Sequence, residues 1–267
     1  MFNIGIDAII LHIGSFEVRW YLITEILAIV AFVSFAFIES KRLNISRRHL
    51  PWLILTIVVA GIILAKLTDV IGRPGYYFSQ PEKVFNPAGM RLAGLLIGAF
   101  VAKLLYSWWT KISFWRVSDL FVPGVVLAMA IFRAGCFVNG CCFGLECSMP
   151  WMAVTYSGAS TIAPANIPLY PVQLYQVLLN LLIFGIIWSY RKRLQPQGAT
   201  YLLYVILFAA GDFIIRLFRQ PDAVFLGIQI QQYLNLMMLM VSVPLLVLRY
   251  RRWFLRYQVA NLFTTEK

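Results

Sequence analysis

The sequence predicts an all-α polytopic membrane protein with seven transmembrane helices. Its 267 residues are 61% hydrophobic and only 13% charged, with a mean hydropathy of +0.77. That composition is typical of membrane proteins and excludes an ordinary soluble domain. Apolar runs of about 20 residues recur along the chain, and this is the length that a helix needs to cross a hydrocarbon layer roughly 30 Å thick.

The predicted spans follow one another within one transmembrane domain, residues 1–267. Neither a repeat of 20–50 residues nor a low-complexity linker divides the sequence, and the loops are too short to hold a second domain. The segment before the first span carries acids and no basic leader, so we expect it to lie along the membrane interface. The spans are Trp20–Ile38, Trp52–Val70, Leu92–Trp109, Leu120–Cys136, Val172–Tyr190, Tyr201–Phe218 and Ile228–Leu248.

Lysine and arginine predict the orientation, because positive residues are retained on the cytoplasmic side of a membrane. Basic loops follow the first, third, fifth and seventh spans, whereas residues 136–170 contain neither lysine nor arginine. The N-terminus is therefore expected outside and the C-terminus in the cytoplasm. The formal charge of +12 is spread over separate loops, so it favours anionic headgroups and excludes a nucleic-acid-binding face.

Charged residues near the outer halves of the spans predict a site for an anionic lipid. Each costs roughly 2.5 kcal/mol or more to insert, so each needs a partner or a water-filled cavity. Ion pairs such as Asp212 with Arg216, one helical turn apart, account for some of them. The remaining excess is cationic and suits a phosphate, which arginine binds through two parallel hydrogen bonds. The residues are Arg19, Glu25, Lys66, Asp69, Arg91, Asp119, Arg133, Asp212, Arg216 and Arg219.

All cysteines of the chain lie in one stretch, "IFRAGCFVNGCCFGLEC" (131–147). Their spacing lacks the Cys-x2-Cys pairs of zinc sites, so we expect no metal. An external position favours one or two disulfides, in which the adjacent Cys141 and Cys142 take different partners. The alternative is a functional thiol beside Arg133, because a nearby cation lowers the pKa of a thiol. The cysteines are Cys136, Cys141, Cys142 and Cys147.

Five sequence blocks, in order along nearly the whole chain, carry a family resemblance. They are "VRWY" (18–21), "AGMRLAGLLIG" (88–98), "SDLFVP…FRAGCFVNGCCFG" (118–144), "YPVQLYQ" (170–176) and "FRQPD…QQYLNLMM" (218–238). The most specific parts are Arg-x-Gly-x-Phe-x-Asn-Gly from Arg133, Pro-x-Gln-Leu-Tyr from Pro171, and Arg-x-Pro-Asp from Arg219. Together they resemble the prolipoprotein diacylglyceryl transferase family.

This resemblance implies a bacterial inner-membrane enzyme whose cavity opens outward and sideways to lipid. Members of that family move the diacylglyceryl unit of phosphatidylglycerol onto the lipobox cysteine of a preprolipoprotein and release glycerol phosphate. Such alkyl transfer to sulfur needs a clamp on the departing phosphate and a means of removing the thiol proton. The expected partners are thus an anionic phospholipid and a lipobox-bearing preprolipoprotein; no cofactor is expected.

Motif position then assigns the candidate site residues. The catalytic candidates are Arg133 as the phosphate clamp, Asn139 and Cys141. The residues expected to bind substrate are Tyr21, Arg133, Gly140, Gln173, Tyr175 and Arg219.

Three departures from the family pattern qualify this assignment. The position of the family histidine is occupied by Ala93, and an arginine and a glutamate of the sixth span are exchanged to give Asp212 and Arg216. The signature Asn-Phe-x-Asn-x-Glu appears with Cys136 and Cys141 in place of the amide and the carboxylate. The sequence therefore leaves three functions open: a diacylglyceryl-type transferase, a homologue that performs thiol redox or another group transfer through its cysteines, and a non-catalytic lipid binder or translocator.

Overall fold

The computed structural model describes residues 2–14, 16–85, 92–149, 151–158, 160–221 and 224–264. The described chain is mostly helical, and six of its helices are long and apolar enough to cross a membrane. A shorter apolar helical stretch, Gly94–Thr110, lies where the third span is predicted. The predicted class, a mainly α-helical multi-pass membrane protein, is confirmed at this level.

Each predicted span overlaps one long helix, but the helices do not begin and end where the apolar runs do. The last three residues of the predicted sixth span, Arg216–Phe218, form a 3-10 helix, and the first two of the seventh, Ile228–Gln229, form a strand. The helix around the predicted Leu120–Cys136 is longer at both ends, and the last helix continues past Leu248 through the basic "RYRRWFLR" segment. Hydropathy marks the apolar part of a helix, whereas backbone hydrogen bonding continues through arginine and other good helix formers. The helices are α1 (Trp20–Arg42), α2 (His49–Gly72), α3 (Pro74–Ser79), η1 (Pro81–Phe85), α4 (Leu92–Thr110), α5 (Phe114–Asn139), α6 (Val172–Tyr190), α7 (Ala199–Ile215), η2 (Arg216–Phe218) and α8 (Ile230–Thr264).

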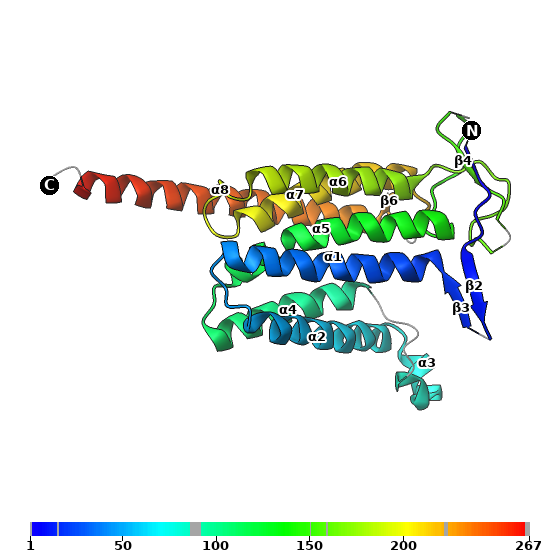
Figure 1. Cartoon of the computed structure of the whole chain (residues 1–267), viewed down its shortest axis with the longest axis horizontal. Helices are drawn as coiled ribbons and strands as arrows, with labels where there is room; N and C mark the ends of the chain where they lie inside the picture. Colours follow the sequence, from blue (N-terminus) through cyan, green and yellow to red (C-terminus); the bar gives the residue numbers. More distant parts are fainter. Residues whose placement is uncertain are drawn as a thin grey trace. The chain divides into compact units, whose positions relative to one another are not determined.

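The chain packs as two compact units, Met1–Phe35 with Phe121–Lys267, and Ala36–Leu120. In the second unit α2 packs against α4 (Figure 1). All the candidate site residues belong to the first unit. Ala93, at the position where the resemblance leads us to expect a histidine, lies in the first turn of α4 and thus in the second unit. Arg91 and Asp222, both named above, lie outside the described residues.

Within the first unit, glycines let α5 approach α1 closely. A Cβ atom on Gly135 would lie 1.9 Å from Oγ1 of Thr24, and one on Gly124 would lie 2.8 Å from the carbonyl oxygen of Phe32. This contact brings the ring of Tyr21 to 5.4 Å from that of Phe132, centroid to centroid. The unit also contains α6, α7 and α8, of which α7 packs against both α6 and α8 (Figure 1).

Short strands fold the segment after α5 onto the end of that helix. They are β1 (Phe2–Ile4), β2 (Ile9–Ile13), β3 (Phe16–Arg19), β4 (Val154–Tyr156), β5 (Val224–Phe225) and β6 (Ile228–Gln229). β1 pairs in parallel with β4, and β2–β3 and β5–β6 are antiparallel hairpins. Ile4, Val154, Tyr156 and Leu169 form a buried cluster against Phe137. The hydroxyl of Tyr156 donates a hydrogen bond of 3.0 Å to the carbonyl of Phe137, which fixes this cluster to α5.

Candidate active site

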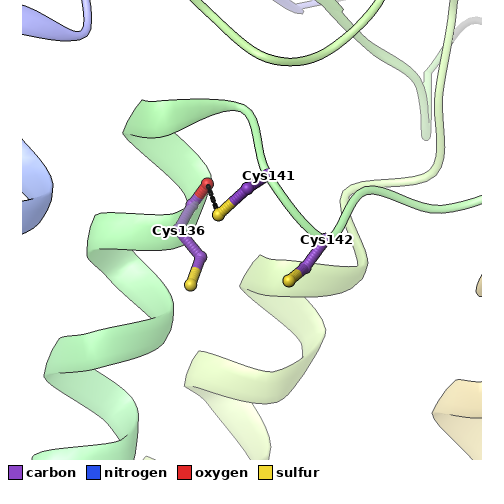
Figure 2. Close-up of side chains that lie close together, drawn as sticks. All are labelled: Cys136, Cys141 and Cys142. Carbon is purple, nitrogen blue, oxygen red and sulfur yellow. Dashed lines mark hydrogen bonds between the residues drawn. The ribbon is translucent and has the colours of Figure 1, made fainter. Parts of the chain in front are cut away.

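The candidate site is built around the turn that ends α5. Gly140 has φ +69°, a left-handed conformation that commonly terminates helices, and Cys142 has φ +58°. The turn leads the chain back toward α5, so that the thiols of Cys141 and Cys142 approach that of Cys136 (Figure 2). The three sulfur atoms lie within 4.8 Å of one another.

These cysteines form no disulfide: all four are free thiols, in contrast to the expectation from the sequence. Cys136 is buried, Cys141 is half-buried and Cys142 is exposed. Cys147 lies outside the group, and its thiol donates to the carbonyl of Met149 at 3.3 Å. The pKa of the Cys142 thiol is lowered, most strongly by hydrogen bonds with the thiols of Cys136 and Cys141. The positive charges of Arg219 and Arg133 lower that pKa further.

Buried amide side chains surround the cysteine turn. Gln173 of α6 is fully buried and donates from Nε2 to the carbonyl oxygen of Cys141 at 2.8 Å. Its Oε1 atom, and Oδ1 of the buried Asn139, accept no hydrogen bond from the residues that the structure describes. A buried acceptor without a donor is costly, so both atoms indicate room for a polar group at this site.

Arg133 projects from α5 one turn before Cys136. Its guanidinium carbon lies 5.8 Å from the ring centroid of Phe132, the residue that Tyr21 contacts. Within the described part of the chain, no carboxylate forms an ion pair with Arg133. Other cations named from the sequence do have acidic partners: Arg19 pairs with Glu17, and Arg216 with Asp212. Arg133 is therefore a half-buried cation that suits an anionic ligand.

Arg219 is positioned by backbone pairing with the cysteine loop. It forms an antiparallel bridge with Gly144, and the amide of Leu145 donates to the carbonyl of Phe218 at 2.9 Å. Arg219 thereby comes near enough to Cys142 for its charge to act on that thiol. Two arginines from distant parts of the sequence thus face one thiol cluster.

Tyr175 of α6, two residues after Gln173, lines an apolar hollow of about 550 Å³ together with Phe137 of α5. Its hydroxyl is buried and has no hydrogen-bond partner among the described residues, and its ring packs 6.1 Å from that of Phe218. The hollow is otherwise lined by Phe2, Phe137, Trp151, Met152, Ala153, Val154, Pro171 and Leu174. Such a surface suits an acyl chain or an apolar peptide segment.

The structure therefore brings most of the predicted site residues to one place. Arg133, Asn139, Gly140 and Cys141 lie along the end of α5, and Gln173 and Arg219 join them from other segments. Sequence reasoning selected Cys141 and missed Cys142, whose thiol is the exposed one near both arginines. The signal that could have found it is the left-handed glycine at position 140, which reverses the chain just before the cysteine pair.

Comparison with known proteins identifies the family. Residues 8–248 match the profile of the prolipoprotein diacylglyceryl transferase family. A phosphatidylglycerol–prolipoprotein diacylglyceryl transferase of Dehalococcoides mccartyi (strain BAV1) is 35% identical over 253 residues, which cover 94% of this chain and 97% of the relative. Proteins of the same name from Aromatoleum aromaticum and Chromobacterium violaceum are 31% and 29% identical, covering 90% and 92% of this chain and 94% and 96% of the relatives. The chain belongs to the prolipoprotein diacylglyceryl transferase family.

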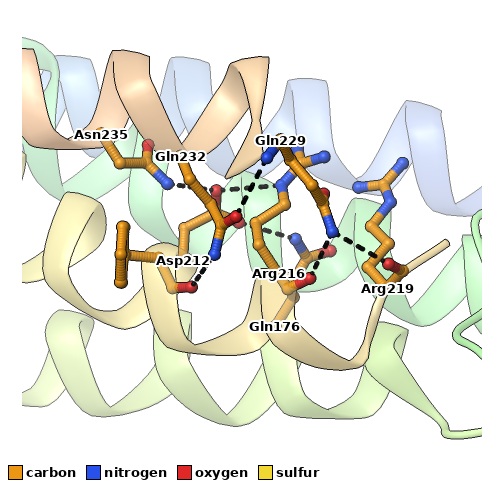
Figure 3. Close-up of polar contacts among 8 residues, drawn as sticks. Gln176, Asp212, Arg216, Arg219, Gln229, Gln232 and Asn235 are labelled. Carbon is orange, nitrogen blue, oxygen red and sulfur yellow. Dashed lines mark hydrogen bonds and ion pairs between the residues drawn. The ribbon is translucent and has the colours of Figure 1, made fainter. Parts of the chain in front are cut away.

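In this family member, the exchanged residues of the sixth span form an internal polar network (Figure 3). Asp212 of α7 accepts hydrogen bonds from Gln176 of α6 at 3.0 Å and from Asn235 of α8 at 2.9 Å, and it pairs with Arg216 at 3.3 Å. The ion pair predicted from their spacing is therefore confirmed. Gln229 continues the network by donating to the carbonyl oxygens of Arg216 and Arg219. Asp212 thus ties α6, α7 and α8 together, and Gln229 links this network to the backbone of Arg219.

In this transferase-family protein, the position of Arg219 depends on a close backbone approach at Gly144, and a substitution at Gly144 tests that contact. A Cβ atom at this position would lie 2.6 Å from the carbonyl oxygens of both Phe218 and Tyr170. Because both are backbone atoms, Gly144→Ala is expected to cost about 1–3 kcal/mol and to displace Arg219. Thermal unfolding of the purified protein in detergent measures this. The matched control is Gly185→Ala in α6, where an added Cβ atom would meet no other described part of the chain within 4 Å, apart from its own helix backbone and neighbours. Alanine is expected to be neutral or slightly stabilising there. Equal unfolding temperatures for Gly144→Ala and wild type would contradict the close approach.

Proposed function

We propose that this protein transfers the diacylglyceryl group of an anionic phospholipid, phosphatidylglycerol, to the lipobox cysteine thiol of a preprolipoprotein. Family membership supports this activity over a thiol-redox enzyme or a lipid translocator. The observation that carries the proposal is Arg133, a half-buried cation without a carboxylate partner in the described chain. It lies on the end of α5 that also carries the free thiol of Cys136, and Phe137 of the same helix end lines the apolar hollow.

In this reaction the donor phosphate is held by Arg133, with Arg219 as a second contact. The acceptor cysteine gives up its thiol proton to water, and its sulfur forms a bond to the terminal glycerol carbon of the diacylglyceryl unit while the bond from that carbon to the phosphate oxygen breaks. Glycerol phosphate leaves with the negative charge, which the guanidinium groups stabilise as it develops. Asn139 and Gly140 line the same position, and Tyr21 and Tyr175 line the cavity toward the acyl chains.

The arrangement in the membrane follows from the same proposal. The protein crosses the bacterial cytoplasmic membrane seven times as one domain, with α4 as its third span. The N-terminus and the cysteine turn face outward, because residues 136–170 lack lysine and arginine, while the C-terminus lies in the cytoplasm after the basic segment 249–256. A preprolipoprotein that presents its acceptor cysteine on that outer side would then reach the site together with the donor lipid.

Complementation tests the proposed activity. A bacterial cell depleted of its own prolipoprotein diacylglyceryl transferase should regain growth and lipid-modified lipoproteins when this chain is expressed. The chain with Arg133→Ala, expressed and inserted to the same level, is the control and should fail. Accumulation of unmodified preprolipoprotein despite normal membrane insertion of the wild-type chain would refute the proposal.

A further inference from the structure

We infer that Cys136, Cys141 and Cys142 bind one zinc ion through three thiolate ligands, and that the open fourth position takes the acceptor thiol. The role given to the open fourth position rests on the proposed function, whereas the zinc site with its three thiolate ligands does not. It departs from the expectation drawn from cysteine spacing, because the structure assembles a group of sulfur ligands that the spacing alone does not indicate.

The distances between the sulfur atoms fit this site. In a tetrahedral site with Zn–S bonds of about 2.3 Å, neighbouring sulfurs lie about 3.8 Å apart. The three sulfur atoms here are within 4.8 Å of one another, so side-chain rotations that move them by about 1 Å complete the site. A disulfide requires two sulfurs about 2 Å apart and would leave the third thiol without a role.

The three ligands stand on a fixed framework. Cys136 belongs to the last turns of α5, and Cys141 and Cys142 follow it in the left-handed turn. The backbone of Cys141 is held on both sides: its amide donates to the carbonyl of Cys136 at 3.1 Å, and its carbonyl accepts from Gln173. Metal sites depend on such supporting contacts, which hold the ligands in position before the ion binds.

The charges around the cluster favour zinc over a hard cation. Arg133 lies one turn before Cys136 on α5, and Arg219 is bridged to Gly144, two residues after Cys142. A cation held only by neutral oxygen ligands would be repelled by these two positive charges. Three thiolates and Zn²⁺ carry a net charge of −1, which two guanidinium groups stabilise. The ligand group consists of sulfur atoms, and soft thiolates select zinc or copper(I) and not magnesium or calcium.

An open fourth position supplies a step that the transfer reaction needs. Catalytic zinc sites keep three protein ligands and one exchangeable position, and a thiol that coordinates zinc loses its proton. The acceptor thiol enters from the side of the exposed Cys142, releases its proton to water and remains as a zinc-bound thiolate. Its sulfur then attacks the glycerol carbon while the phosphate departs to Arg133. No oxidant or reductant is consumed, and the family histidine, here Ala93, is not required for deprotonation.

Metal analysis of the purified full-length chain tests the site itself. The wild-type protein is reduced, stripped of metal in detergent and then supplied with zinc. It should bind about one zinc per chain. Cobalt(II) in place of zinc should produce the intense visible and near-ultraviolet bands of a tetrahedral thiolate site. Cys136→Ser and Cys142→Ser should each lower zinc affinity at least 10-fold. Cys147→Ser is the matched control and should keep full zinc binding, because Cys147 lies outside the group.

If the serine variants do not fold, the cobalt spectrum of the wild-type protein still shows whether the three thiols bind a metal ion. Four titratable thiols without bound zinc, or a disulfide within the group, would overturn the inference.

A transfer assay separates failure of this site from failure of the proposed activity. With phosphatidylglycerol in detergent and a lipobox peptide, removal of zinc should lower turnover about 100-fold, a size typical of lost acid–base assistance, and added zinc should restore it. Full turnover in metal-free enzyme would overturn the role of zinc and leave the transferase intact. Zinc binding without any transfer would leave the metal site intact and refute the transferase.

Discussion

Replacing Arg133 with lysine is expected to lower the rate of diacylglyceryl transfer about 100- to 1000-fold, the range found when one preorganised donor to a developing anion is removed. Lysine keeps the positive charge but not the planar fork that binds a phosphate through two hydrogen bonds. Arg133→Ala removes the charge as well and should lose more. Because the phosphate gains charge as it leaves, we expect the loss mainly in kcat and less in KM.

The measurement is the initial rate with phosphatidylglycerol and a lipobox peptide, made on protein whose thermal unfolding matches that of the wild type. Arg73→Lys serves as the control, because Arg73 is exposed and already pairs with Asp69. That variant should keep its activity within about a factor of two of wild type, because lysine keeps the positive charge beside Asp69 and Arg73 is not one of the candidate site residues. Wild-type rates in Arg133→Ala would remove the phosphate clamp from the mechanism.

The spans could be predicted from the sequence because the bilayer imposes a minimum apolar length on every crossing helix. The segments between the spans could not, since their structure depends on contacts between residues far apart in the chain. β1 pairs with β4 across about 150 residues of sequence, and Arg219 reaches the cysteine turn through its bridge to Gly144. Neither contact leaves a local pattern.

Within the candidate site, some residues could likewise be predicted from the sequence and others could not. Arg133, Asn139 and Gly140 could be named because they form a compact motif on one helix end. The thiol cluster depends, beyond the turn at Gly140, on a left-handed backbone at Cys142, a conformation that is uncommon for residues other than glycine. Gln173 was named as a residue that binds substrate; the structure shows that its amide group holds the carbonyl of Cys141, a positioning contact that sequence alone does not distinguish from a ligand contact.

The polar network between α6, α7 and α8 leads to a second large effect, this time on stability. Asp212 is 2% exposed and receives hydrogen bonds from Gln176 and Asn235 in addition to its ion pair with Arg216. Asp212→Ala removes the carboxylate from a buried guanidinium and from two buried amides. Breaking such a pair from one side is expected to cost about 3–5 kcal/mol.

A double variant distinguishes the loss of a stabilising bond from the burial of an uncompensated charge. Asp212→Ala with Arg216→Met removes both charges, so it should be more stable than Asp212→Ala alone, and the coupling between the two positions should reach about 0.5–3 kcal/mol. Glu17→Ala is the control, since it breaks the exposed pair with Arg19 and should cost less than about 1 kcal/mol. Denaturant unfolding of the detergent-solubilised proteins measures all three. If Asp212→Ala unfolds like the Glu17 variant, the polar network does not hold the helices together.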